Sequence, residues 1–256
     1  MSVSQKALQS GNPKRPEQKN AIKLSPHPIW IENLLDIAQA YQQRITTHRL
    51  FEEFKKGLLT VRQSQGALIN FYPLINTFPQ YMALSLSKVP EENSPRNRYT
   101  RNWLITNIGQ ERLHGAWWRQ FAAGFKVDAA IFDEEIVPPP EMDAINHYLW
   151  RICTYGTLAE GIAASNFAVE GATGQWTKSI HGSFGKYQGV QGVEIDKRTL
   201  RWVAAHADYD DRHPFEALEI MKAFATTKEE QKRVSHATVR TLEYYELALD
   251  ACYEMF

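Results

Sequence analysis

Apolar residues recur at steps of three and four along the chain from about residue 28 onward, and strict alternation of apolar and polar residues is almost absent. This spacing gathers the apolar side chains on one face of a helix. The pattern predicts helices at about 28–44, 47–57, 58–88, 96–125, 141–172, 174–187, 197–224 and 228–255. The expected fold class is therefore all-α.

Proline and glycine mark the breaks between these helices. Pro90 with the EENSP that follows it, VPPPEMD at 137–143 and the glycine-rich YQGVQGVEID each interrupt the helical pattern. Thr227 with Glu230 predicts a capping box at the start of the last helix. No repeat and no long linker divides the chain, so we expect residues 23–256 to form one bundle of about seven to eight helices, preceded by a disordered polar tail at 1–22.

Composition and charge narrow the functional classes. The 256 residues are 43% hydrophobic, which is enough for a sizeable core, and they carry 29 basic and 29 acidic side chains. This balance, without a local basic run, argues against nucleic acid as a partner. No apolar run is long enough for a membrane span or a signal peptide, and Cys153 and Cys252 have neither disulfide-framework nor zinc-finger spacing. We expect a cytoplasmic protein.

The sequence HADYDDRH at 206–213 places three side chains of metal-ligand type on one stripe of a helix. Steps of four and then three residues return to nearly the same side, so His206, Asp210 and His213 would face the same way. A carboxylate between two imidazoles is a donor set that suits a metal ion.

Two further segments offer similar side chains. Glu111 and His114 are one turn apart on the predicted fourth helix, and Glu170 closes a markedly apolar run on the fifth. An ionised carboxylate in such surroundings is costly unless a positive charge meets it. Glu160, ten residues earlier and on another face of the same predicted helix, is the competing candidate.

Together these segments give three carboxylates and three imidazoles from three helices. Mixed oxygen and nitrogen donors suit iron or manganese, and six ligands are more than one catalytic ion uses while keeping a position for substrate. Two ions are therefore the better interpretation. The alternative is a polar network of hydrogen-bonded core histidines. The remaining histidines are interpreted as surface or capping residues: His27, His48, His147, His181 and His236.

These residues resemble a known family. The NIGQE sequence ending at Glu111, the glutamate of AVEG and the triple His206, Asp210 and His213 resemble the haem-oxygenase-like di-iron oxidases, relatives of the TenA and PqqC proteins. Residues 57–83 are similar to the family's second-helix region. Many members place the first histidine seven residues after the glutamate, where this chain has Trp118. The Glu111-x-x-His114 spacing looks instead like the UndA group of medium-chain fatty-acid decarboxylases, which form terminal alkenes.

The resemblance implies a site and a reaction. Glu111, His114, Glu170, His206, Asp210 and His213 would bind two Fe²⁺ ions, with O2 as co-substrate. An activated oxygen species would remove a hydrogen from the β carbon of a fatty acid, for example dodecanoic acid, and loss of CO2 would leave 1-undecene. The implied partners are the fatty acid and an external electron donor or reductase that the sequence does not identify; a homodimer is left open. Candidates for the alkyl pocket are Trp103, Trp118, Phe121 and Phe167.

Pro214 departs from a regular helix directly after His213. Because proline disfavours helical geometry at the preceding residue, we expect His213 to be displaced and the second iron to be weakly held. Two other functions remain open: a di-iron oxidase of an amino acid or amine, and a non-catalytic metal- or fatty-acid-binding protein. A cofactorless PqqC-like oxidase is discounted, because it would leave six residues of metal-ligand type without a role, and a TenA-like thiamin hydrolase is discounted as well. The TenA-like chemistry needs an activated cysteine, for which neither Cys153 nor Cys252 has a convincing context.

Overall fold

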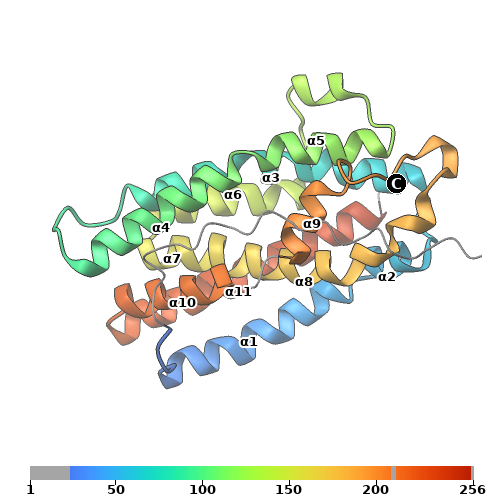
Figure 1. Cartoon of the computed structure of the whole chain (residues 1–256). Helices are drawn as coiled ribbons and strands as arrows, with labels where there is room; N and C mark the ends of the chain where they lie inside the picture. The colour runs from blue at the N-terminus through green and yellow to red at the C-terminus, as the bar shows by residue number, and fades with distance from the viewer. Residues whose placement is uncertain (1–23, 209–211, 255–256) are drawn as a thin grey trace, which may run out of the picture.

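The computed structural model describes residues 24–208 and 212–254, and none of these residues forms a β-strand (Figure 1). The expected all-α fold is confirmed. The helices are α1 (Ile29–Thr46), α2 (Arg49–Lys56), α3 (Val61–Leu86), α4 (Pro95–Glu111), α5 (His114–Gly124), α6 (Pro140–Tyr155), α7 (Leu158–Ile162), α8 (Glu170–Ile180), α9 (Arg201–Asp208), α10 (Arg212–Phe224) and α11 (Lys228–Glu254). Shorter 3-10 turns and one π-helix, η2 (Ala163–Val169), connect them. The expected tail at 1–22 lies outside the described residues.

Long amphipathic helices pack side by side to form the bundle. α3, α6 and α11 contact one another, α1 packs against α8 and α11, and α4 and α5 pack against α3. Large side chains with almost no solvent exposure fill the space between them, among them Trp202, Tyr81, Phe125, Phe184 and Leu149. Within the described part of the chain, no helix is both long enough and apolar enough to cross a membrane.

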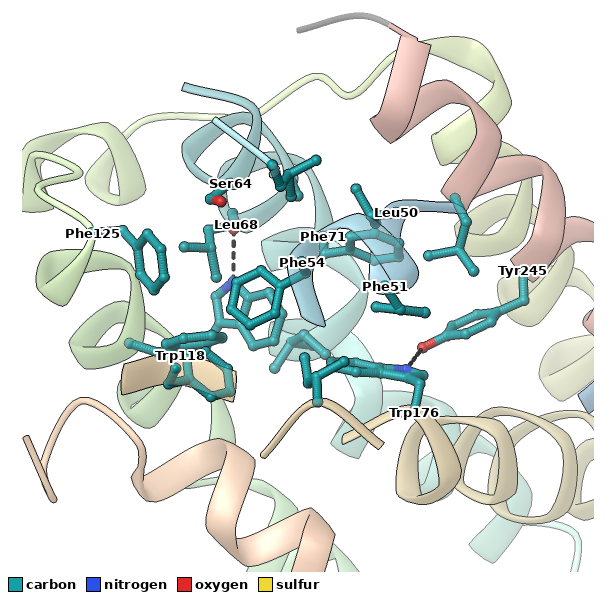
Figure 2. A pocket seen from close by; sticks show the side chains of 17 residues that line it. Leu50, Phe51, Phe54, Ser64, Leu68, Phe71, Trp118, Phe125, Trp176 and Tyr245 are labelled. Carbon is teal, nitrogen blue, oxygen red and sulfur yellow. Dashed lines mark hydrogen bonds between the residues drawn. The ribbon is translucent and has the colours of Figure 1, made fainter. Parts of the chain in front are cut away.

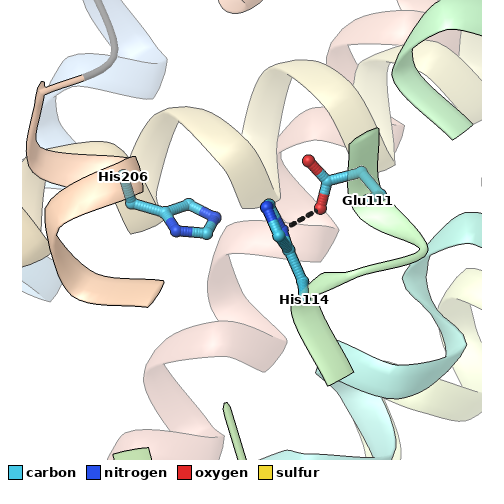
Figure 3. A group of neighbouring side chains, drawn as sticks. All are labelled: Glu111, His114 and His206. Atoms are coloured by element: carbon cyan, nitrogen blue, oxygen red, sulfur yellow. Dashed lines mark ion pairs between the residues drawn. The ribbon is translucent and has the colours of Figure 1, made fainter. Parts of the chain in front are cut away.

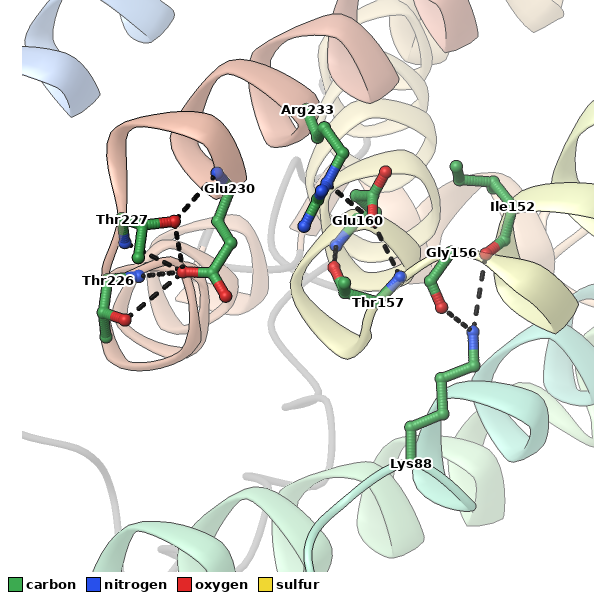
Figure 4. Close-up of polar contacts among 9 residues, drawn as sticks. All are labelled: Lys88, Ile152, Gly156, Thr157, Glu160, Thr226, Thr227, Glu230 and Arg233. Atoms are coloured by element: carbon green, nitrogen blue, oxygen red, sulfur yellow. Dashed lines mark hydrogen bonds and ion pairs between the residues drawn. The ribbon is translucent and has the colours of Figure 1, made fainter.

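Capping interactions explain where several helices begin. The predicted capping box of α11 is present: the Glu230 amide donates to Thr227 Oγ1 at 3.2 Å, and the Thr227 amide donates to Glu230 Oε2 at 2.8 Å (Figure 4). Thr157 and Glu160 form a second capping box, which starts α7. Each box pairs two backbone amides that have no partner within the helix.

Three predicted helices are not continuous elements in the structure. The helix expected at 96–125 breaks after Glu111 and resumes at His114, and the one expected at 197–224 is divided into α9 and α10. The helix expected at 141–172 ends at Gly156, where a Cβ atom would lie 2.6 Å from the Ile152 carbonyl oxygen. Only glycine fits that close approach.

Candidate metal centre

Three of the predicted ligand residues meet inside the bundle. Glu111 is the last residue of α4, His114 is the first residue of α5, and His206 comes from α9. One ligand atom from each lies within 4.8 Å of the other two, and Figure 3 shows the side chains pointing toward one another. The Glu111 carboxylate and the His114 imidazole are buried, and His114 Nδ1 lies 2.5 Å from Glu111 Oε2. The break between α4 and α5 therefore falls between two members of this group.

The backbone orients the His206 ring. His206 Nδ1 lies 2.8 Å from the Trp202 carbonyl oxygen, an acceptor, so Nδ1 carries the proton and Nε2 keeps its lone pair. The ring also packs on the Trp202 indole, with 4.0 Å between ring centroids. Burial, and then the nearby His114, lower the pKa of His206 to about 3. The imidazole is consequently neutral at physiological pH, which is the form that binds metals.

Glu170 and His213 form a second group next to the first. Glu170 Oε2 lies 3.4 Å from His213 Nδ1, and Asn166 Nδ2 donates a hydrogen bond of 2.9 Å to Glu170 Oε1. Burial raises the pKa of Glu170, as expected for a carboxylate in apolar surroundings. Glu170 also lines a pocket of about 350 Å³ together with Glu111, His114 and His206. Glu170 therefore faces the same space as the first group, and His213 lies beside Glu170.

The structure assigns the two histidines of the expected stripe to different helices. His206 and His213 belong to two helices, α9 and α10, rather than to one continuous stripe, and Asp210 lies outside the described residues. Pro214 is the third residue of α10. Proline is tolerated in the first turn because the amide it lacks would have no helical partner there. The structure therefore provides no kink at His213 to weaken a second site.

Glu160, the competing candidate for the third carboxylate ligand, takes part in a helix cap instead. Its carboxylate accepts a hydrogen bond of 2.8 Å from the Thr157 amide, and Arg233 Nε lies 3.7 Å away (Figure 4). It does not line the pocket that contains Glu170 and the three-residue group. Glu170 is consequently the better candidate for the third carboxylate ligand.

Sequence reasoning missed Glu216, a buried carboxylate close to His213. Glu216 Oε2 accepts a 2.7 Å hydrogen bond from Trp103 Nε1, and the Trp103 ring lies edge-on to His213 with 6.2 Å between centroids. The available signal was its position three residues after His213, which places both side chains on one face of a helix. Trp103 therefore contacts both Glu216 and His213.

The donor chemistry of these groups fits a mononuclear or dinuclear iron site. Carboxylates from Glu111 and Glu170 and imidazoles from His114, His206 and His213 converge without a thiolate, which suits iron or manganese. Buried carboxylates can bridge two ions, as they do in helical di-iron proteins. Of the six predicted ligand residues, the structure groups Glu111, His114 and His206, and it pairs Glu170 with His213.

A large apolar cavity adjoins this centre (Figure 2). The empty space between its walls, counted together with the solvent at its open side, is about 640 Å³. The walls come mainly from α2, α3, α5, α8 and α11 and include Phe51, Phe54, Leu68, Phe71, Trp118, Phe121, Trp176 and Tyr245. Ile75 lines both this cavity and the pocket of the metal-ligating group. Of the predicted pocket residues, Trp118 and Phe121 line the cavity, whereas Trp103 and Phe167 do not.

Comparisons with known proteins place this fold and site in context. Solved structures with the same fold include a TenA homologue from Pseudomonas syringae pv. tomato DC3000 (27% identity, TM-score 0.80, covering 91% of this chain and 99% of that one). A TenA homologue from Pyrococcus furiosus is 13% identical (TM-score 0.70, covering 88% of this chain and 100% of that one). A haem-oxygenase-like domain of unknown function from Shewanella denitrificans OS217 is 16% identical (TM-score 0.69, covering 90% and 94%).

No curated protein matches the sequence. The family model described as iron-containing redox enzyme matches residues 65–246, a span that includes all six predicted ligand residues. Taken with the convergence of glutamate and histidine side chains between α4, α5 and α9, this match shows that the chain belongs to the family of iron-containing redox enzymes with a haem-oxygenase-like fold.

Proposed function

We propose that this protein is a non-haem di-iron oxidase that converts medium-chain fatty acids, about C10 to C14, into terminal alkenes and CO2. The observation that supports this most is the apolar cavity next to the metal-ligating group. Its wall is almost entirely aliphatic and aromatic, and it shares Ile75 with the pocket of Glu111, His114 and His206. A ligand with an anionic head and an unbranched apolar tail matches both spaces.

The cavity would supply most of the binding free energy. Each methylene of the tail that leaves water contributes about 0.8 kcal/mol. The cavity also fixes which carbon approaches the metal centre, and this matters because the methylenes of an alkyl chain have nearly identical reactivity. Holding the carboxylate at one end of the cavity would select the β carbon by position.

The proposed overall reaction needs electrons from outside the substrate. Dodecanoic acid, O2, two electrons and two protons give 1-undecene, CO2 and two water molecules. The substrate provides two electrons when the double bond forms, and an external donor provides the other two that the complete reduction of O2 requires. An electron donor or reductase is therefore part of the proposal.

The residues of this chain have separate tasks in the reaction. Glu111, His114, Glu170, His206 and His213 would hold the iron, which supplies O2 activation when bound. Trp202 fixes the His206 ring through its carbonyl group, and Asn166 holds one oxygen of Glu170. Apolar side chains of the cavity exclude water from the reacting carbon.

The competing functions find less support. An amino-acid or amine oxidase would need charged groups around the distal cavity, but the residues that line it carry no ionised side chain. A TenA-like hydrolase would need a reactive thiol in the cavity. Neither cysteine lines it, both are buried, and burial raises the pKa of Cys153 to about 11 and that of Cys252 further.

The direct test is headspace gas chromatography of the purified protein with ferrous iron, reductant, air and a series of C10 to C14 acids. We expect a terminal alkene one carbon shorter than each accepted acid. Oxygen consumption without alkene would contradict the fatty-acid substrate and would redirect the search to amino acids and amines. Binding of the acid without any oxidised product would favour a non-catalytic binding protein.

A second experiment tests the number of iron ions. The two neighbouring groups of candidate ligands lead us to expect two Fe²⁺ per chain, one of them at Glu170 and His213. Glu170→Gln is expected to lower the affinity of that ion at least about tenfold, because a neutral amide is a poor iron ligand.

Glu160→Gln is the matched control, since glutamine can preserve the capping box. Anaerobic titration monitored by iron analysis measures both. Loss of the second ion in Glu160→Gln, or its tight binding in Glu170→Gln, would contradict the assignment.

A further inference from the structure

A chain of hydrogen bonds lies where the apolar cavity meets the pocket of the metal-ligating group. Trp176 Nε1 donates to the Tyr245 hydroxyl oxygen at 2.8 Å (Figure 2), and the Tyr245 hydroxyl lies 3.1 Å from Thr173 Oγ1. Trp176 and Tyr245 line the apolar cavity, whereas Thr173 lines the pocket that contains Glu111, His114, Glu170 and His206. The chain therefore links the two spaces.

These three side chains have one more polar hydrogen than the hydrogen bonds between them require. Trp176, Tyr245 and Thr173 carry one polar hydrogen each, but only two hydrogen bonds connect them. The proton of one hydroxyl is consequently left over. Neither hydroxyl has another partner among residues 24–208 and 212–254, and the two side chains are only 5% and 3% exposed. A buried donor without an acceptor costs free energy, so such a group marks a place for a ligand atom.

Other buried threonines show that this arrangement is unusual in the chain. The hydroxyls of Thr100, Thr177, Thr238 and Thr241 each donate to the carbonyl oxygen four residues earlier. Thr173 is also within a helix, but its hydroxyl turns toward Tyr245. The Thr173 hydroxyl therefore does not donate to a carbonyl oxygen of its own helix, unlike the other four.

A second donor in excess belongs to a residue of the same pocket. Trp202 lines the pocket, and its Nε1 is buried without a hydrogen-bond partner in the described part of the chain. Donors in excess beside a metal centre suit a ligand that contributes only acceptors. A carboxylate is such a ligand, since it has two oxygens and no proton when ionised.

We propose that the Thr173–Tyr245 hydroxyl pair is an anchor for the substrate carboxylate, additional to the metal ions. Thr173 is one turn after Glu170 on α8, so its hydroxyl is close to the space that the head group would occupy. Tyr245 and Trp176 would orient the Thr173 hydroxyl so that its proton faces the carboxylate. This inference rests on the proposed function, because it assigns the head group of that same substrate.

The test compares ligands that differ in the head group. Quenching of tryptophan fluorescence reports binding, since Trp118 and Trp176 line the cavity. Full-length iron(II)-loaded protein is titrated without O2 with dodecanoic acid and, separately, with undecane, which has a tail but no carboxylate. Thr173→Val keeps the side-chain shape and is expected to weaken dodecanoate binding about tenfold while leaving undecane binding unchanged. Thr173→Ser is expected to restore the affinity.

Thr177→Val is the matched control, because that hydroxyl bonds only to helix carbonyls and lines neither space. It should bind both ligands as the wild type does. Unchanged dodecanoate affinity in Thr173→Val, or equal weakening of both ligands, would overturn the anchor while leaving the proposed function intact. A wild-type protein that does not bind dodecanoate would overturn the proposed substrate and the anchor together.

Discussion

His206→Ala is expected to remove iron from the group formed with Glu111 and His114 and to lower alkene formation by more than about a hundredfold. His206 contributes the ring from α9 that completes this group, and its Nδ1 is already engaged by the Trp202 carbonyl oxygen. No other imidazole of the described residues lies within ligand distance of the pair. Iron analysis after anaerobic reconstitution, together with headspace gas chromatography, measures the two losses.

His236→Ala is the control for this substitution, because His236 is an exposed histidine on α11. It should retain full iron content and activity. Far-UV circular dichroism establishes that both variants are folded. Normal iron content and alkene yield in a folded His206→Ala protein would exclude His206 from the metal centre and would require a different ligand set.

Trp202→Ala is expected to cost about 3–5 kcal/mol in the free energy of unfolding, the range for truncating a fully buried tryptophan. The Trp202 side chain is 1% exposed and lies against Trp118, Trp176 and His206, with ring centroids 4.5, 5.8 and 4.0 Å away. The substitution removes the surface on which the His206 ring packs. We therefore expect weaker iron binding in addition to the loss of stability.

Urea unfolding of the metal-free protein separates these two effects, because iron stabilises only the folded state. Trp150→Ala serves as the comparison. Trp150 is 41% exposed and has one aromatic neighbour, Tyr81, so its loss should cost about 1 kcal/mol. Equal unfolding midpoints for the two variants would contradict the central packing role of Trp202.

The all-α fold was predictable because it depends on a local property, the spacing of apolar residues. The positions at which the helices break were harder to predict. α6 ends where the backbone becomes extended at Gly156, a position where a neighbouring carbonyl oxygen leaves no room for a Cβ atom, and Thr157 then begins a new capping box. Both require knowledge of how segments approach one another. The predicted pair at Glu111 and His114 was correct in its proximity but wrong in placing both residues on a continuous helix.

The cavity shows most clearly where sequence reasoning ends. Its wall combines residues of five helices that are far apart in the chain, and aromatic residues in such positions have the same pattern as ordinary core residues. Trp118 and Trp103 were equivalent candidates in the sequence. In the structure the Trp118 indole faces the cavity and donates to the Leu68 carbonyl oxygen, whereas Trp103 donates to Glu216. The two tryptophans thus differ in hydrogen-bond partners that are far away in the sequence, and such partners cannot be identified from the sequence pattern.

The π-helix Ala163–Val169 sets the rotational register of α8, which follows it directly. Its wider turns contain more residues than α-helical turns, so the side chains of α8 are rotated about the helix axis relative to an uninterrupted α-helix. Glu170 and Thr173 share this rotation, because both follow the π-helix and are one turn apart. Deleting a single residue within the π-helix would turn both side chains away from the pocket by about 100°. The metal ligand and the proposed carboxylate anchor are thus mechanically linked, and an insertion or deletion in this segment would affect them as a pair.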